Sequence, residues 1–490
     1  MLFGKPRKST SHGSAGWTKP GRDLLLPKAK PTTPGLFYLG ETRRYHIALS
    51  REQTQKHGVI IGGSGTGKSR GYFLPNAALS RSTSLVCTDP KGELWRYTSG
   101  YHSPAIRFAP AEPERSACFN WIPLCHSARI AELCARAIVE SGNTGHTEQA
   151  WIDLETSFLA ALFSHAATLS EPTPLSAYRL FTRQPQEELL AQLLSSPSPS
   201  AQEQAVIFQQ TQERMRGSIV PVVAAKLQFL RDPAVAQFVS AEHYAPNFGR
   251  LRRVPYAIYF CMREQDIARL RPLASVFFSL LLEQIAGEEI REGESSTPIL
   301  MLLDEFANIG VLPHFETTIS LARGRGVAMW LGIQSLSQLE ARYGKANADT
   351  ILTNCSTKIA LPGLDVKTGT YISQALGEQT IITNKKSRHR RWFLWTPTGA
   401  TVSRSEHGRS LLTADEVRRI GEDEAIVVVG NRRPMLLQKQ HYRGAACEAP
   451  CSSLHEARGI NLSILPAKLP TLSIPEMPDS LTRTLQLVVK

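Results

Sequence analysis

Short apolar runs that end in polar turns recur along most of the chain. Runs of this kind, rich in β-branched residues and separated by segments with helical spacing, are typical of buried parallel strands. Strands are expected at about 57–62, 84–88, 256–260, 298–303, 327–333 and 357–361. The pattern therefore predicts an α/β fold with a mainly parallel sheet.

A different pattern occupies residues 126–246, where apolar positions follow helical spacing. Helical segments are expected at 128–140, at 147–169, near 186–194 and near 202–230, with a loop of Ser and Pro at 195–200. Trp151, Leu154, Phe158, Leu159 and Leu162 lie along one stripe of the second segment, which is typical of a packed core. The sequence therefore predicts an all-α domain inserted into the α/β domain.

The ends of the chain have less regular patterns. Hairpins are expected at 36–49 and 392–405, and a pair of strands at 425–440. The first 35 residues are rich in Lys, Pro, Ser, Thr and Gly, which predicts a disordered basic tail. The predicted domains are this tail (1–35), the α/β domain in two parts (36–125 and 247–443), the all-α domain (126–246) and an irregular C-terminal tail (444–490).

The net charge of +13 is concentrated in two regions. Residues 1–45 hold nine Lys or Arg against two acidic residues, and residues 383–443 hold thirteen against six. Such regions suit a polyanion or an acidic membrane surface, and solubility is the ordinary alternative. In the second region, 388–392 (Arg-His-Arg-Arg-Trp) fits either nucleic-acid contact or an exposed hairpin with one packed ring.

The cysteines and the apolar segments indicate a cytosolic compartment. Eight scattered cysteines without a CxxC pair indicate reduced thiols. No apolar segment typical of a signal peptide is visible at the N-terminus, and no run approaches the roughly 18 apolar residues that cross a bilayer. The longest candidate, 276–282, is expected to be the buried face of a helix.

One motif has recognisable chemistry. Gly62, Gly63, Ser64, Gly65, Thr66, Gly67, Lys68 and Ser69 fit the phosphate-binding loop, and an apolar strand precedes them. Glycines let the backbone wrap around phosphate oxygens, and a helix starting at Lys68 adds partial positive charge. Lys68 is expected to reach the β and γ phosphates of a nucleotide, and the Ser69 hydroxyl to ligate Mg²⁺.

A second motif ends the apolar run at 298–303, where Asp304 and Glu305 follow directly. Ligands of α/β proteins lie at the carboxyl ends of parallel strands. Asp304 is therefore expected to hold Mg²⁺ through water, and Glu305 to polarise an attacking water as a general base. A solvated acidic turn is the alternative for this pair taken alone.

The order of the motifs resembles that of one family, the TraG/TraD-type coupling proteins of type IV secretion systems, over about 50–440. The matching segments are the phosphate loop, Asp-Pro-Lys-Gly-Glu at 89–93, the helical insertion, Leu-Leu-Asp-Glu-Phe-Ala-Asn-Ile-Gly at 302–310, Ala-Arg-Gly-Arg-Gly-Val at 322–327 and Gln-Ser-Leu-Ser-Gln-Leu at 334–339. The resemblance implies a hexameric RecA-like P-loop ATPase that uses ATP and Mg²⁺. It also implies delivery of relaxase-bound DNA, or of effector proteins, to the subunits of a secretion channel.

The resemblance also assigns residues. Lys68, Ser69, Asp304 and Glu305 fall on the family's ATPase positions. Arg323 matches an arginine that reaches the nucleotide of the neighbouring subunit, although Arg325 is a rival, and Gln334 matches a polar residue that senses the γ-phosphate. Two exposed turn arginines and an ordinary polar residue at a strand end are the alternatives.

The chain departs from the family's pattern near its N-terminus. Members usually begin with transmembrane helices, whereas this phosphate loop starts at Gly62 after a polar tail. We therefore expect a cytoplasmic ring at the inner face of the bacterial inner membrane, with the anchor absent or supplied by a separate membrane protein. Two other functions stay open: a DNA translocase of the FtsK/HerA-like superfamily, and a non-hydrolysing receptor that binds nucleotide only to hold its shape.

Overall fold

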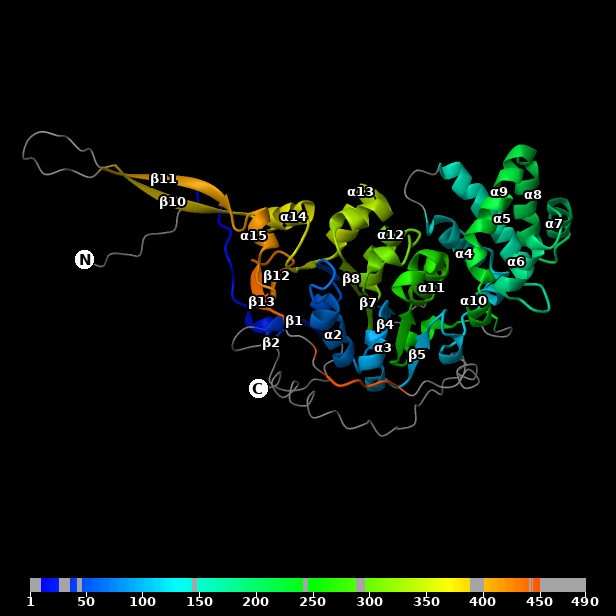
Figure 1. Cartoon of the computed structure of the whole chain (residues 1–490), viewed down its shortest axis with the longest axis horizontal. Coiled ribbons are helices and arrows are strands. Elements are labelled where there is room, and N and C mark those ends of the chain that lie inside the picture. Colours follow the sequence, from blue (N-terminus) through cyan, green and yellow to red (C-terminus); the bar gives the residue numbers. More distant parts are fainter. Residues whose placement is uncertain are drawn as a thin grey trace, which may run out of the picture.

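The computed structural model describes residues 10–25, 36–41, 46–142, 148–240, 246–287, 296–387, 401–439, 442 and 444–449. Figure 1 shows a central sheet with helices around it, a helical domain beside it, and a long hairpin that projects from the opposite side. The predicted segment 388–392 and most of the two predicted tails (1–9, 26–35 and 450–490) lie outside the described residues.

The apolar runs form one sheet, whose eleven described strands have the order β2-β1-β13-β12-β9-β3-β8-β7-β4-β6-β5. They are β1 (Phe37–Glu41), β2 (His46–Leu49), β3 (Gly58–Ile61), β4 (Ser84–Asp89), β5 (Ala105–Phe108), β6 (Ala257–Cys261), β7 (Ile299–Leu303), β8 (Val327–Ile333), β9 (Thr357–Ala360), β12 (Glu424–Val429) and β13 (Met435–Gln438). Every neighbouring pair from β9 to β5 is parallel, while β12, β13, β1 and β2 pair antiparallel. The predicted α/β fold with a mainly parallel sheet is therefore confirmed.

Both faces of the sheet are covered by helices, because strand side chains alternate between two cores. In β7, Ile299, Met301 and Leu303 face one core, and Leu300 and Leu302 face the other. Helices α11 (Ile267–Gly287), α12 (Phe315–Gly324), α13 (Leu336–Asn354) and α14 (Val366–Leu376) pack in the first core, and η2 (Ser69–Phe73), α2 (Leu74–Leu79) and α3 (Glu93–Thr98) in the second. Two short helices, α1 (Arg51–Thr54) and α15 (Ala414–Arg418), complete the α/β domain.

The helical insertion leaves and rejoins the sheet at one edge, because it lies between the neighbouring strands β5 and β6. Its helices are α4 (Ala128–Glu140), α5 (Gln149–Ala166), α6 (Pro174–Thr182), α7 (Gln186–Leu194), α8 (Pro199–Gln210), α9 (Glu213–Lys226) and α10 (Pro233–Phe238). The segment expected near 202–230 is two helices, because the backbone turns extended at Thr211 and Gln212. The apolar stripe on α5 lies in or against the core, as predicted.

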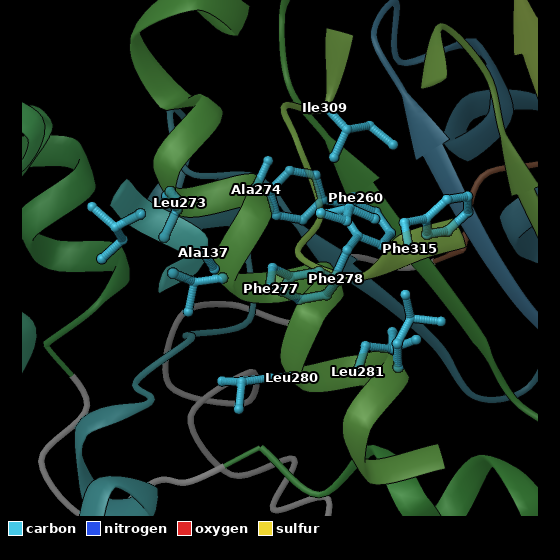
Figure 2. Close-up of a cluster of buried hydrophobic side chains, with 14 of the residues drawn as sticks. Ala137, Phe260, Leu273, Ala274, Phe277, Phe278, Leu280, Leu281, Ile309 and Phe315 are labelled. Carbon is cyan, nitrogen blue, oxygen red and sulfur yellow. The ribbon is translucent and has the colours of Figure 1, made fainter. Parts of the chain in front are cut away.

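Helix α11 joins the insertion to the sheet. Figure 2 shows its Phe277 and Phe278 between Ala137 of α4, Phe260 of β6 and the segment holding Ile309. The Phe277 ring lies 4.6 Å from that of Phe260, and 5.0 Å from each of the rings of Phe108 and Phe119. Within the described residues one segment, Glu264–Gly287, is long and apolar enough to span a membrane by length and composition alone. Here it packs as a core helix, so the expectation of a buried face at 276–282 is confirmed.

Two expectations about the edges are wrong. The hairpin expected at 392–405 is instead β10 (Glu378–Ser387) paired with β11 (Thr401–Ser410). Residues 10–25, expected to be disordered, are placed against the fold: the Ala15 amide donates to the Glu378 carbonyl at 2.8 Å, and Leu24 is buried. Open strand edges offer unpaired backbone groups to such a segment, and composition alone does not show this.

Candidate active site

The phosphate-loop motif follows β3 as a tightly curved segment. A Cβ on Gly62 would lie only 2.6 Å from Thr66 Oγ1, so this position needs glycine. Gly65 and Gly67 have φ angles of 77° and 87°, which side chains disfavour. Thr66 Oγ1 donates to the Gly63 carbonyl at 2.8 Å and holds the curve closed. The expected helix starts at Lys68 with a π-helical turn, η2, before α2.

Lys68 is buried beneath this loop, with 5% of its surface exposed. Its Nζ donates to the Gly62 carbonyl at 2.6 Å and to the Gly63 carbonyl at 3.2 Å. It also lies 3.5 Å from Glu305 Oε1. A buried ammonium group requires anionic partners, and a single carboxylate satisfies it only in part.

The acidic strand end meets the loop because strand order places β8 between β3 and β7. Ser69 Oγ donates to Asp304 Oδ2 at 2.5 Å, across 235 positions of sequence. Burial raises the pKa of Asp304, and the charge of Glu305 acts in the same direction, while the Ser69 hydroxyl opposes them. A cation between these oxygens would favour the ionised carboxylate.

Glu305 is held in an unusual backbone conformation, with φ 53° and ψ 42°. Left-handed backbone at a non-glycine residue costs about 1–2 kcal/mol and is concentrated at functional sites. Glu305 Oε2 accepts from the side-chain Nε2 of Gln334 at 2.9 Å, and Gln338 Oε1 accepts from the backbone N–H of Gln334 at 3.2 Å. Because Gln334 follows β8, it stands between the loop and the acidic strand end.

The phosphate loop with Lys68 and Ser69, and the carboxylates of Asp304 and Glu305, share one cleft of about 320 Å³. The turn at 89–93 supplies another wall. The cleft is lined by Gly63, Ser64, Gly65, Gly67, Lys68, Ser69, Arg70, Asp89, Pro90, Lys91, Glu93, Leu94, Asp304 and Glu305.

The donor set fits a magnesium-bound nucleoside triphosphate. A hydroxyl and a carboxylate at 2.5 Å, with further carboxylates nearby, match the oxygen ligands that Mg²⁺ prefers. The incompletely neutralised Lys68 and the glycine cradle match phosphate oxygens. When bound, the metal would supply positive charge that offsets the charge of the phosphates. The residues to hold it would be Ser69 and Asp304.

Arg323 and Arg325 are not brought to this cleft. Both are exposed, Arg323 in the last turn of α12 and Arg325 directly after that helix, next to the start of β8. The phosphate loop instead follows the other end of the parallel strand β3. Arg323 acts electrostatically on Glu52 and His57, which precede β3, and the Arg325 carbonyl accepts from Arg252 Nη1 at 2.5 Å. Neither arginine can act on a nucleotide held by its own chain.

Sequence reasoning missed three polar residues of the site region. Arg70 lines the cleft, Gln338 fixes the Gln334 backbone, and Lys439 Nζ donates to the Thr66 carbonyl at 2.8 Å. The first two lie close to residues that the motifs identified, so motif spacing could have suggested them. Lys439 lies 373 positions from Thr66, and nothing local to Lys439 indicates that contact.

The buried carboxylate of Asp89 lowers the stability of the fold when it is ionised. Burial raises its pKa to about 6, although the Trp95 amide, which donates to Asp89 Oδ2 at 2.8 Å, opposes the shift. The folded protein thus binds this proton more tightly than the unfolded chain, where the pKa is about 3.9. The resulting stabilisation is present below about pH 4 and is lost as the pH rises through about 6.

Asp89→Asn is therefore expected to stabilise the fold at pH 7, by about 1–3 kcal/mol. The gain should grow between about pH 4 and pH 6 and level off by about pH 7. Urea unfolding of parent and variant at several pH values measures it. A stability difference that does not change with pH would contradict the proposed cause.

The sheet, the loop and the acidic strand end define a protein of the P-loop NTPase class with a RecA-like core. The profile of the family described as type IV secretory system conjugative DNA transfer matches residues 15–458, so the chain belongs to that family. The conjugal transfer protein TraG of Escherichia coli is 26% identical, over 84% of this chain and 71% of that protein. Protein VirD4 of Rhizobium radiobacter is 26% identical, over 79% of this chain and 57% of that protein.

Solved structures share the fold. The bacterial conjugative coupling protein TrwBdeltaN70 in unbound form superposes with a TM-score of 0.67 at 18% identity, covering 89% of this chain and 92% of that one. The plasmid coupling protein TrwB in complex with ADP and Mg²⁺ has a TM-score of 0.63, also at 18% identity, covering 87% and 91%. The helical insertion is therefore part of a fold already seen in coupling proteins.

Proposed function

We propose that the chain is an ATP-hydrolysing coupling protein, which recruits relaxase-bound DNA or an effector protein and delivers it to a type IV secretion channel. The observation that carries this proposal is the single cleft in which the phosphate loop, Asp304 and Glu305 meet. Membership of the conjugative DNA transfer family supplies the substrate class.

The residues that the two motifs identified each have a role in the proposal. Lys68 binds the β and γ phosphates, while Ser69 and Asp304 hold Mg²⁺. Glu305 takes the proton of the attacking water, with its carboxylate oriented by the Gln334 amide at 2.9 Å. Gln334 is thereby placed to report whether the γ-phosphate is present.

The proposal includes a homo-hexameric ring, in which Arg323 reaches the cleft of the neighbouring protomer. Its exposure, and its place beyond the opposite end of the strands from the phosphate loop, support this role. We further propose that the ring acts at the inner face of the inner membrane together with a separate anchor protein. The cargo is gripped through phosphate contacts, which are independent of base sequence.

Hydrolysis by the isolated protein is expected to be slow and to rise when DNA is added, because DNA assembles and engages the ring. Since the grip is electrostatic, the stimulation should fall steeply between about 50 and 200 mM salt. Phosphate release with and without single-stranded DNA measures both effects. A non-hydrolysing receptor would bind ATP and release no phosphate. A chromosome-type DNA pump would hydrolyse ATP but would not restore conjugative transfer to a strain lacking its coupling protein.

A further inference from the structure

A segment that follows β13 packs against the outer side of the two walls of the nucleotide cleft. Past β13, the described residues Lys439, Tyr442 and 444–449 run along the helices that line the cleft. In Figure 1 this stretch is the orange trace that passes α2 and α3 toward β5. We call it the strap.

The strap contacts the phosphate-loop wall first. Lys439 is buried, and its Nζ donates to the Thr66 carbonyl at 2.8 Å. Its aliphatic stem lies against Gly71 of η2, where an added Cβ would come within 3.7 Å of it. Further along, the Tyr442 amide donates to the Arg70 carbonyl at 2.8 Å. Thr66 belongs to the phosphate loop, and Arg70 lines the cleft.

The strap then contacts the second wall, formed by α3 after the turn at 89–93. Tyr442 reaches this wall too, since its hydroxyl donates to the Tyr97 carbonyl at 3.2 Å. Glu448 Oε1 accepts from the indole of Trp95 at 2.7 Å. The remaining bonds are Cys447 N to Arg96 O at 3.0 Å, Gly100 N to Cys447 O at 2.8 Å and Ala449 N to Ser99 Oγ at 2.8 Å.

The close approach at Gly100 is built into the sequence. A Cβ there would lie 2.6 Å from Cys447 Sγ and 2.9 Å from the Cys447 carbonyl oxygen. The φ angle of Gly100 is not positive, so its backbone does not require glycine. Gly100 therefore lacks a side chain because the strap occupies the space where a Cβ would lie.

We propose that Lys439 is a positioning residue of the nucleotide site, and that the strap joins the two walls of the cleft and slows nucleotide release. This inference rests on the proposed function. The phosphate loop and α3 are separate segments that both line the cleft. Because the strap is hydrogen-bonded to both walls, it fixes the distance between the phosphate loop and α3. A bound nucleotide leaves when that distance increases. Lys439 touches no atom in the cleft itself and acts through the Thr66 carbonyl.

Two variants loosen the strap at opposite ends. Lys439→Met keeps the aliphatic stem and removes the hydrogen bond, whereas Gly100→Val displaces the strap from α3 without altering the phosphate loop. Lys439→Met is expected to speed dissociation of a fluorescent ADP analogue with Mg²⁺ from the full chain by about tenfold, the effect of one charge-assisted hydrogen bond. Gly100→Val should have a similar effect, because it releases the other end of the same strap. Lys439→Arg should restore slow release.

The double variant is the decisive measurement. If the strap acts as one unit, the double variant should release nucleotide at the same rate as either single variant. If the two sites are independent, their effects on the rate should multiply. Lys358→Met is the matched control, because Lys358 is a half-buried lysine that, like Lys439, donates to a backbone carbonyl, here that of Cys355 at 3.0 Å. It should lower stability without changing release.

The outcomes separate this inference from the proposed function. If the parent protein binds the ADP analogue and Lys68→Ala does not, the nucleotide site stands. Unchanged release in Lys439→Met, or multiplied effects in the double variant, would then overturn the strap alone. A parent protein that binds no nucleotide would overturn both.

Discussion

Glu305→Gln is expected to lower ATP hydrolysis by about 10²–10⁴-fold while leaving nucleotide binding nearly unchanged. Glutamine has the same shape and can still accept from Gln334, but it cannot take a proton from water. The lost negative charge also removes a partner of Lys68, which is 3.5 Å away, so phosphate binding should not weaken. Steady-state phosphate release and titration with a fluorescent ATP analogue measure the two effects separately.

Lys68→Ala is the opposite case, since it should abolish both binding and hydrolysis. The matched control is Lys367→Ala, because Lys367 is not among the residues that line the cleft, is half exposed and pairs with Glu340. An exposed ion pair contributes little, so this variant should stay close to the parent protein. If Glu305→Gln retains most of the parent's turnover, Glu305 is not the general base.

Arg323→Ala is expected to reduce turnover of the assembled ring by about 10³-fold or more, without weakening nucleotide binding by a protomer. An arginine supplied from a neighbour neutralises charge that develops on the transferring phosphoryl group. Arg325→Ala is the matched control two positions away, where the backbone carbonyl already bonds Arg252. The pair decides which arginine acts across the interface.

Mixing two inactive proteins tests the interface directly. Lys68→Ala retains Arg323 but has no working phosphate loop, and Arg323→Ala has the reverse defect. In mixed rings some interfaces combine the intact loop of one protomer with the intact arginine of the next, so activity should return. Activity that stays absent in verified mixed rings, or that is kept by Arg323→Ala, would show that Arg323 does not act in trans.

Sequence pattern predicted elements well where physical causes are local. The strand at 327–333 and the helix at 128–140 have the predicted bounds, because burial on two faces or on one stripe leaves a periodic signature. The β10–β11 hairpin was misplaced because its strands project from the sheet and alternate little between apolar and polar residues. The docked segment 10–25 was missed for a related reason: its partners lie near residues 47, 378 and 432.

The candidate site divides in the same way. Residues 62–69 identify a phosphate loop because glycine spacing and a following lysine and hydroxyl are local requirements of phosphate binding. That the loop meets Asp304, Glu305 and Gln334 follows from the order β3-β8-β7, which no segment encodes by itself. The distance of Arg323 from the cleft also depends on the tertiary structure, because it is set by the place where α12 ends.

By itself, the sequence determined the kind of elements, the loop that cradles phosphate and the acidic residues available to a metal. The tertiary structure alone decided which of these share a cleft, that Arg323 and Arg325 lie outside it, and that Lys439 supports the loop from 373 positions away. The physical reason is that periodicity reports whether a side chain is buried, whereas neighbours in space depend on strand order and packing. Those are properties of the whole chain, and they set the distances on which chemistry depends.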